Sequence, residues 1–377
     1  MSPRAKEAGQ AAHQRLDARS HLRARPAGTR IAPIANPEIP SEVGLLLGQY
    51  LCSQLSADGL AFASWPEEFS DGWETYTYSF HLEGDKPLPP AFSRPLVLRI
   101  YPDRRGLARA RHEFAVLQHL SLRGFPVSEP LLLEENCGYF GGPFLLRAEV
   151  PGETLLRAML RCPWRLWSGP RHMAALQAQL HRLPVDGFPS PSGPLLSRSL
   201  EEMAQDIRAA NWRSLAAGLD WLVAHRPAPP RVSRILHLDF HPMNLIHQVK
   251  GPLVPIDWTE ADVGDPHADV ATSLVLTECT PTKNTTRLDR LSVRAGRFFF
   301  VHRYLKAYRR KLPLDKATLA YYRAWAALGR LCRYGKWLDG GSVSAFCKSS
   351  AAAQIQPNEW RALELYFQKW TGVSIRL

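Results

Sequence analysis

Two aspartates and an asparagine between positions 237 and 258 have the side chains and the spacing that phosphoryl transfer requires. Asp239 lies five residues before Asn244, and Asp257 follows thirteen residues after Asn244. Short apolar runs flank them, so the pattern predicts a strand, a loop and a second strand that hold the three together. Transfer from a nucleotide needs a carboxylate that accepts the proton of the attacking hydroxyl, and oxygen ligands for magnesium. The alternative interpretation is that Asp239 and Asn244 are ordinary turn residues and that Asp257 ends a strand.

The same segment belongs to a longer motif. It reads His237-Leu-Asp-Phe-His-Pro-Met-Asn, followed by Ile-Asp-Trp at 256–258 and by Gly264-Asp-Pro-His-Ala-Asp. These segments resemble those of aminoglycoside phosphotransferases and choline-kinase-like enzymes, which read close to His-Gly-Asp-Leu-His-Pro-Gly-Asn, then Ile-Asp-Trp and Gly-Asp-Pro. The resemblance covers about residues 42–335, and the last forty residues match no known pattern.

The resemblance implies a role for each polar side chain of the motif. Asp239 is expected to be the catalytic base or to orient the acceptor hydroxyl. Asn244 and Asp257 are expected to bind Mg²⁺, because hard oxygen donors suit that ion. Positions that brace the loop or cap a helix are expected at His237, Asp265 and Asp269.

The resemblance also implies an α+β, bilobal protein-kinase-like fold with a small antiparallel-sheet N-terminal lobe and a larger, mainly helical C-terminal lobe. Residues 1–36 are expected to form a disordered basic arm, 37–148 the nucleotide-binding lobe, and 149–377 the catalytic and acceptor-binding lobe. Local patterns agree with this order. They predict helices at 42–56 and 106–121 and strands at 76–82, 95–101, 126–133 and 144–150.

An ion pair that orients a phosphate-binding cation is predicted between Arg99 and Glu113. Glu113 falls on the apolar face of its predicted helix, between Ala110 and Leu117. A buried carboxylate needs a cationic partner, and Arg99 on the preceding strand is the candidate. The alternative is a glutamate at the edge of the face that reaches solvent. Protein kinases carry lysine where Arg99 stands, and arginine presents a planar fork in place of a point charge.

The loop that covers the nucleotide in kinases corresponds to Ser70–Tyr76. It contains one glycine, so backbone amides together with Thr75 or Ser70 are expected to contact the phosphates. A plain β-turn before a strand is the alternative interpretation.

The segment Phe-Leu-Leu-Arg-Ala-Glu-Val-Pro-Gly at 144–152 resembles the hinge that binds adenine through its backbone. The expected contacts lie between Arg147 and Val150, and include Ala148. Here Arg147 and Ala148 stand where relatives often have an apolar and an acidic residue. His181, at a predicted helix end, is interpreted as structural rather than catalytic.

Composition limits the class of protein. The chain has 377 residues, of which 45% are hydrophobic, and it has no apolar run of the length that spans a membrane. Six cysteines lack Cys-x-x-Cys spacing, which argues against a zinc site and a disulfide framework. These features lead us to expect a cytoplasmic protein, and the motif with its resemblance implies an enzyme that uses ATP, with GTP left open, and Mg²⁺.

The net charge of +12 is unevenly distributed and bears on the acceptor. Residues 1–36 carry +5, 37–280 carry −7, and 281–377 carry +14. Arg303, Lys306 and Arg310 repeat at helical spacing in the last part. They are interpreted either as a solvated helix face or as a wall that favours an anionic acceptor. The expected partner is therefore a small-molecule acceptor, anionic or neutral, and not a polycationic aminoglycoside.

Two other functions fit parts of the sequence. A nucleotide-binding pseudokinase with a scaffold or regulatory role is favoured by Arg99 and the poor covering loop, and opposed by the intact Asp239, Asn244 and Asp257. A nucleic-acid-binding protein is suggested only by the basic ends, and no recognised nucleic-acid motif supports it. Oligomeric state leaves no trace in the sequence.

Overall fold

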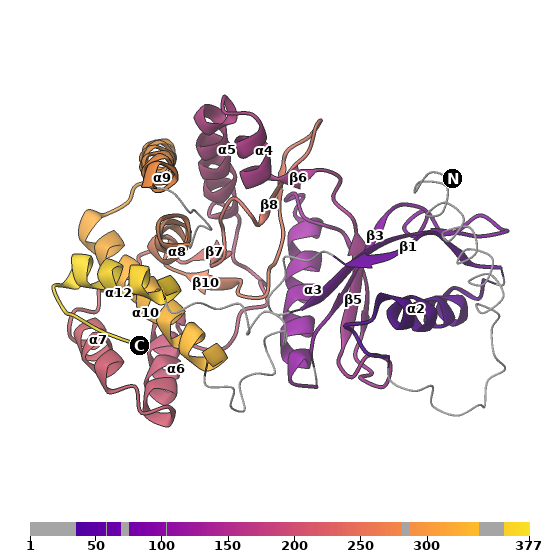
Figure 1. Ribbon diagram of the computed structural model, residues 1–377, viewed down its shortest axis with the longest axis horizontal. Helices are drawn as coiled ribbons and strands as arrows, with labels where there is room; N and C mark the ends of the chain where they lie inside the picture. The colour runs from indigo at the N-terminus through magenta and orange to yellow at the C-terminus, as the bar shows by residue number, and fades with distance from the viewer. Residues whose placement is uncertain (1–34, 58, 69–74, 103, 281–286, 339–357) are drawn as a thin grey trace. The chain divides into compact units, whose positions relative to one another are not determined.

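The computed structural model describes residues 35–57, 59–68, 75–102, 104–280, 287–338 and 358–377 (Figure 1). They form two compact units. The first comprises the described residues of 35–114 and 129–149, and the second comprises 115–128 and the described residues from 150 onward. The predicted basic arm, up to residue 34, and most of the predicted covering loop lie outside the described residues.

The first unit is built on one antiparallel sheet of five strands, in the order β1-β2-β3-β5-β4. The predicted strands are confirmed, although their ends differ by a few residues. The strands are β1 (Ala61–Glu68), β2 (Tyr76–Glu83), β3 (Leu96–Ile100), β4 (Pro130–Glu134) and β5 (Phe144–Ala148). Along β2 the buried side chains alternate with partly exposed ones, as expected for a sheet with one face against a core.

The strand β1 is absent from the predicted elements. It lies at the sheet edge, and its pairing with β2 shifts register between Phe62 and Ser64 and again between Ser64 and Glu67. Pro66 falls within the second irregular stretch. Proline cannot donate to a ladder and is tolerated at edges and bulges, so the sequence pattern of this strand is weak.

Two helices pack on the sheet of the first unit. The helix α2 (Pro40–Leu55) begins with a proline at its first turn and buries Val43, Leu47 and Leu51 in a core shared with β2, β3 and β5. The helix α3 (Leu107–Leu122) contributes Ala110 to a smaller cluster with Tyr101 and Leu145, residues of the opposite sheet face. Both helices were predicted from their apolar spacing, and both are confirmed.

The second unit is mainly helical (Figure 1). Its two small sheets pair β7 with β10 and β6 with β8 and β9. Its strands are β6 (Glu153–Thr154), β7 (Arg234–Leu236), β8 (Leu245–His247), β9 (Leu253–Pro255) and β10 (Asp262–Gly264). Its helices are α4 (Leu155–Arg161), α5 (Arg165–Leu180), α6 (Leu195–Ala209), α7 (Arg213–Ala224), α8 (Pro266–Cys279), α9 (Arg287–Arg309), α10 (Lys316–Leu338) and α12 (Asn358–Thr371).

One continuous core supports the second unit. Leu236, Phe240 and Trp258 bring the motif segments into it, and helix α8 is buried along most of its length. The end of α3 and the loop after it also belong here, because Leu120 and Phe125 pack in this core. Residues 115–128 therefore differ from the predicted boundary, which assigned them to the N-terminal lobe. Among the described residues, no helix is long and apolar enough to span a membrane.

Candidate functional site

The loop that joins β7 to β8 carries the predicted catalytic residue, and backbone contacts hold it in an unusual conformation. Leu238 has φ of 61° and Asp257 has φ of 64°, values that non-glycine residues adopt at a cost. The Leu238 N–H donates to Asp269 Oδ1 at 2.6 Å. This bond fixes the loop just before Asp239, so the direction of the Asp239 side chain is set by the fold.

His237 is fully buried below the loop and joins its two halves. Its Nε2 lies 3.1 Å from the Ile256 carbonyl oxygen, and its Nδ1 lies 3.2 Å from the Asp239 N–H nitrogen. A carbonyl can only accept and an N–H can only donate, so the ring is neutral with its proton on Nε2. Burial lowers the pKa of His237 and favours this form. His237 therefore braces the loop, and a neutral ring held at both nitrogens is poorly placed to shuttle protons.

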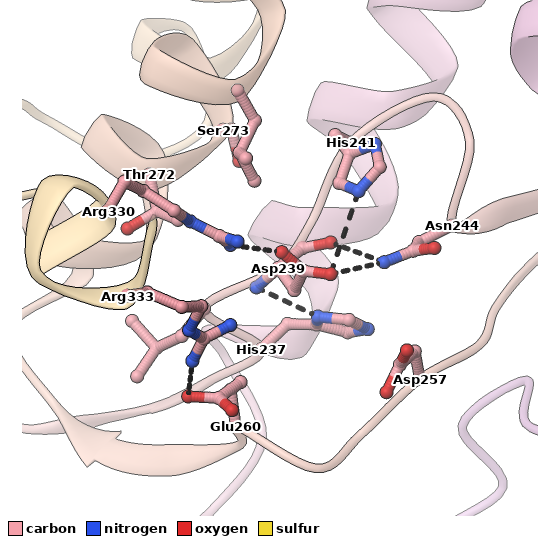
Figure 2. A network of polar contacts seen from close by, with 12 residues as sticks. His237, Asp239, His241, Asn244, Asp257, Glu260, Thr272, Ser273, Arg330 and Arg333 are labelled. Carbon is pink, nitrogen blue, oxygen red and sulfur yellow. Dashed lines mark hydrogen bonds and ion pairs between the residues drawn. The ribbon is translucent and has the colours of Figure 1, made fainter. Parts of the chain in front are cut away.

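Asp239 is partly exposed, with 17% of its side chain accessible. Its Oδ2 accepts a hydrogen bond from Asn244 Nδ2 at 2.6 Å and lies 3.6 Å from His241 Nε2. Its Oδ1 is ion-paired with Arg330 (Figure 2). Burial raises the pKa of Asp239, but Arg330 and His241 outweigh burial and hold it well below its usual value. The carboxylate is therefore ionised at neutral pH.

Asn244 and Asp257 lie beside Asp239 because the backbone of Ile256 joins the segments. The Ile256 N–H donates to the Asn244 carbonyl at 2.9 Å, while its carbonyl accepts from His237. The Asn244 Nδ2 donates to both the carbonyl oxygen and the carboxylate of Asp239. The Oδ1 of Asn244 therefore points away from Asp239. Asp257 follows directly, and its Oδ1 accepts from the Thr259 hydroxyl at 2.9 Å. Figure 2 shows Asn244 bonded to Asp239, with Asp257 on the separate segment that leads to Glu260.

These side chains suit a magnesium ion that is shared with a nucleotide. Among the described residues, no group of three or more His, Cys, Asp or Glu side chains forms a metal site. Mg²⁺ typically uses one or two protein oxygens and completes its octahedron with phosphate oxygens and water. The Asn244 Oδ1 and the Asp257 carboxylate are such donors, so the residue types fit the ion.

Asp269 accepts three hydrogen bonds and is fully buried in the first turn of α8. Besides Leu238, it accepts from Gln177 Nε2 and from His181 Nε2, each at 2.9 Å. Burial raises the pKa of Asp269, but His181 outweighs burial and lowers it overall. His181 also contacts the Tyr308 hydroxyl through Nδ1. Asp269 thus connects the β7–β8 loop to α5, α8 and, through His181, to α9.

Asp265 is the N-cap of α8. Its Oδ1 accepts from the His267 N–H at 2.9 Å, and Pro266 occupies the first turn. It also contacts the His267 ring at 2.6 Å. Asp265 holds the start of the helix that carries Asp269 and has no direct contact with Asp239 among the described interactions.

In the first unit, Arg99 and Glu113 form a buried ion pair. Their closest atoms are 3.1 Å apart, and their side chains are 5% and 1% exposed. The Tyr101 hydroxyl also donates to Glu113, and Arg99 lies over the Tyr101 ring. Glu113 therefore does not reach solvent. The pairing partner expected from the helical pattern is the one observed.

Two backbone N–H groups of the predicted hinge segment form hydrogen bonds within the first unit. The Ala148 N–H donates to the Glu129 carbonyl, and the Glu149 N–H donates to the Pro95 carbonyl, each at 2.9 Å. The N–H of Ala148 is thus engaged within the first unit. Val150 follows the end of β5, and its N–H makes no such bond among the described contacts. Arg147 is buried on the same sheet face as Arg99. In the β3–β5 pairing Arg99 lies opposite Leu145, and Leu145 and Arg147, two residues apart on β5, share a face.

Thr75 is buried at the start of β2, beside the undescribed residues 69–74. The first unit contains Thr75, Arg99, Glu113, Arg147 and Ala148, and the second contains the other predicted site residues. Of those in the second unit, His237, Asp239, Asn244, Asp257 and Asp269 come together around the β7–β8 loop, whereas Asp265 caps α8 and Val150 follows the end of β5.

Arg330 was missed by sequence reasoning, although it contacts Asp239 directly. It lies on α10, ninety-one residues after Asp239. The signal that was available is the helical repeat of Arg330, Arg333 and Lys336, but the residues singled out for the acceptor wall were those of α9.

The basic residues from Arg303 to Arg310, in and just after α9, contact Trp167 or line a surface hollow, and none has a described contact with Asp239. Tyr304 and Tyr308 are buried in the core, whereas Lys306, Arg309 and Arg310 are exposed. Arg303 stacks over the Trp167 ring at 4.4 Å and donates to the Trp167 carbonyl. The other bases line a surface hollow of about 430 Å³ formed by His302, Leu305, Lys306, Arg309 and Arg310. The expectation that Arg303, Lys306 and Arg310 wall the acceptor site has no support in these contacts.

Residues 65–313 match the model of a family described as "Phosphotransferase enzyme family". The chain is 30% identical over 230 residues to acyl-CoA dehydrogenase family member 10 of Mus musculus. That match covers 55% of this chain and 20% of the mouse protein, so the chain spans about a fifth of that relative.

Solved structures of phosphotransferases share the fold. One is described as a putative aminoglycoside phosphotransferase of Ralstonia eutropha, with a TM-score of 0.60, 17% identity, and coverage of 88% of this chain and 98% of that one. Another is the amicoumacin kinase hAmiN in complex with AMP-PNP, Ca²⁺ and Ami, with a TM-score of 0.53, 18% identity, and coverage of 81% and 88%. The predicted α+β protein-kinase-like fold is therefore confirmed.

Proposed function

Since this chain belongs to the phosphotransferase enzyme family, we propose that it is a magnesium-dependent small-molecule kinase that transfers the γ-phosphoryl group of ATP to a hydroxyl. The observation that carries the proposal is the joining of Asp239, Asn244 and Asp257 through the backbone of Ile256. A base and two oxygen ligands are thereby held by one set of hydrogen bonds. GTP as donor is left open, because hinge contacts are made by the backbone.

Asp239 receives the proton in the proposed reaction. The acceptor oxygen forms a bond to the γ-phosphorus, the bond from that phosphorus to the bridging oxygen breaks, and its electron pair leaves with ADP. The proton of the acceptor hydroxyl passes to the Asp239 carboxylate, which is ionised because Arg330 and His241 outweigh the effect of burial on its pKa. Placement and charge neutralisation dominate such transfers, so the bonds that aim Asp239 matter as much as its basicity.

Asn244 and Asp257 would hold Mg²⁺ against the phosphates. When bound, the ion supplies positive charge that neutralises the phosphate oxygens. The Asn244 side chain has a second task, since its nitrogen holds Asp239 while its oxygen serves the metal. One side chain thus couples the position of the base to the position of the ligand.

Arg99 is the proposed phosphate-orienting cation of the first unit. Glu113 fixes one side of the guanidinium, and the Tyr101 hydroxyl fixes Glu113. Arginine can present two parallel N–H groups to a phosphate, whereas lysine presents a point charge. Thr75, Arg147 and Val150 are proposed to lie near the nucleotide, Val150 through its backbone N–H.

The decisive experiment compares Asp257→Ala with the wild type in a coupled assay for ADP release across an acceptor library. We expect turnover to fall about 10³-fold or more, in keeping with the loss of an essential group. Asp220→Ala is the matched control, because it removes an exposed carboxylate from α7. It should leave turnover unchanged.

The same experiment separates a kinase from a nucleotide-binding pseudokinase. A pseudokinase would bind ATP, as measured by a shift in Tm, and would release no ADP beyond the Asp257→Ala background with any acceptor. That result would overturn the enzymatic proposal.

A further inference from the structure

Arg330 places a positive charge beside the Asp239 carboxylate, which in the proposed reaction accepts the proton of the acceptor hydroxyl. It projects from α10, is ion-paired with Asp239 Oδ1, and is 19% exposed (Figure 2). Among the described residues its guanidinium makes this one hydrogen bond, of the five that it can donate. An acceptor whose hydroxyl reaches Asp239 must therefore approach Arg330 as well.

Ionisation of the base does not by itself account for this arginine. Burial raises the pKa of Asp239, but His241 opposes that effect, as does Arg330. The ion pair also weakens Asp239 as a proton acceptor, because a lower pKa means a weaker base. A role in holding the acceptor accounts for both the position and the charge of Arg330.

Two acidic side chains from other segments pair with bases of the same helix. Arg333, one turn further along α10, pairs with Glu260 at 2.8 Å, and Lys336 pairs with Asp206 at 2.5 Å. Spacing of three residues places these bases on neighbouring parts of one helix face. A polycationic acceptor would be repelled by the guanidinium of Arg330, whereas an anionic acceptor would meet its unshared donors.

We propose that Arg330 binds an anionic group of the acceptor, so that the substrate is a hydroxyl compound carrying a carboxylate or a phosphate close to the hydroxyl that is phosphorylated. This inference rests on the proposed kinase function and names its substrate class. The guanidinium fork matches either anion with two parallel hydrogen bonds. Arg330 is thus a residue that determines specificity, while Asp239 accepts the proton.

The test measures kcat/KM for matched acceptors that differ in one charge. Hydroxycarboxylic acids such as glycerate, gluconate and 3-hydroxybutanoate are compared with their methyl esters. Glycerol phosphate is compared with glycerol, which distinguishes a phosphate from a carboxylate as the recognised anion. Ethanolamine and choline supply cationic acceptors. The ratio of acid to ester is measured within one enzyme, so effects of a variant on Asp239 itself cancel.

Wild-type enzyme should favour the charged member of at least one pair by about 10–100-fold, the effect of a charge-assisted hydrogen bond. Arg330→Gln should bring that ratio close to one by raising KM for the acid while KM for the ester stays the same. Arg330→Lys should give an intermediate ratio, since it keeps the charge and loses the fork. Lys316→Gln, which removes an exposed charge at the start of the same helix, should leave the ratio unchanged.

The outcomes separate the two proposals. An unchanged acid-to-ester ratio in Arg330→Gln, or a wild-type preference for esters or amino alcohols, overturns the anionic acceptor and leaves the kinase assignment standing. Loss of all acceptor-dependent ADP release, together with no shift of Tm by ATP and Mg²⁺, overturns the kinase assignment itself.

Discussion

At the scale of single residues, His237 shows how a family motif works through hydrogen bonds. It carries no charge, contacts no reacting atom, and yet it links Asp239 to Ile256 through its two ring nitrogens. A cation at this position would lose the bond from the Asp239 N–H, because a protonated Nδ1 cannot accept. The loop geometry therefore depends on a neutral ring.

This dependence predicts that the protein loses stability on mild acidification. The folded-state pKa of His237 is lowered, so as pH falls through about 6.5 the unfolded chain binds a proton that the folded chain does not. The contribution is fully present above that pH and is lost as pH falls toward the folded-state pKa. Histidine ¹⁵N NMR should show Nδ1 of His237 still unprotonated at pH 6, and a ring that titrates at or above 6.5 would contradict the assignment.

At the scale of elements, the N-terminus of α8 organises the second unit. Asp265 caps the helix, and one turn later Asp269 bonds to Leu238, Gln177 and His181. A single carboxylate therefore connects the β7–β8 loop with α5, α8 and, through His181, with α9. Its lowered pKa agrees with a charge that is compensated by donors from every side.

Substitutions at these two aspartates should have unequal costs. Asp265→Ala removes a cap and should lower the free energy of unfolding by about 1 kcal/mol. Asp269→Asn leaves buried donors without an acceptor and should cost roughly 3–5 kcal/mol. Urea unfolding of both variants measures the difference. Equal costs would mean that Asp269 does not support the loop.

At the scale of the whole molecule, positive charge is concentrated in the segment that includes Arg330. The chain carries +12 overall, and residues 281–377 carry +14. Like charges about 5 Å apart repel by about 3 kcal/mol at an effective dielectric constant of 20, which corresponds to about a 100-fold loss of affinity. An ammonium group placed next to Arg330 would meet repulsion of this order.

Kanamycin should therefore be a poor acceptor, with kcat/KM about 100-fold or more below that of the best hydroxy acid. Raising NaCl from about 0.05 M to about 0.5 M should lower kcat/KM for anionic acceptors and leave that for their esters nearly constant, because salt screens charge. Efficient phosphorylation of kanamycin would be decisive evidence against this reading of the charge.

Much of the fold follows from local patterns. Helices α2 and α3 and strands β2, β3 and β5 appear in the sequence because their apolar spacing matches the period of each element. Strand β1 does not, because Pro66 and two register shifts weaken its pattern. The Arg99–Glu113 pair could be predicted because a glutamate on an apolar helix face must find a cation nearby.

The sequence by itself determined the chemical groups and their local frame: an aspartate, an asparagine and a second aspartate that a short strand–loop–strand segment brings together. Only the tertiary structure decided what surrounds them. Asp269 reaches the loop from thirty-one residues away, and Arg330 reaches Asp239 from ninety-one. The reason is physical, since local periodicity specifies which face of a helix is buried but not which distant segment that helix will meet.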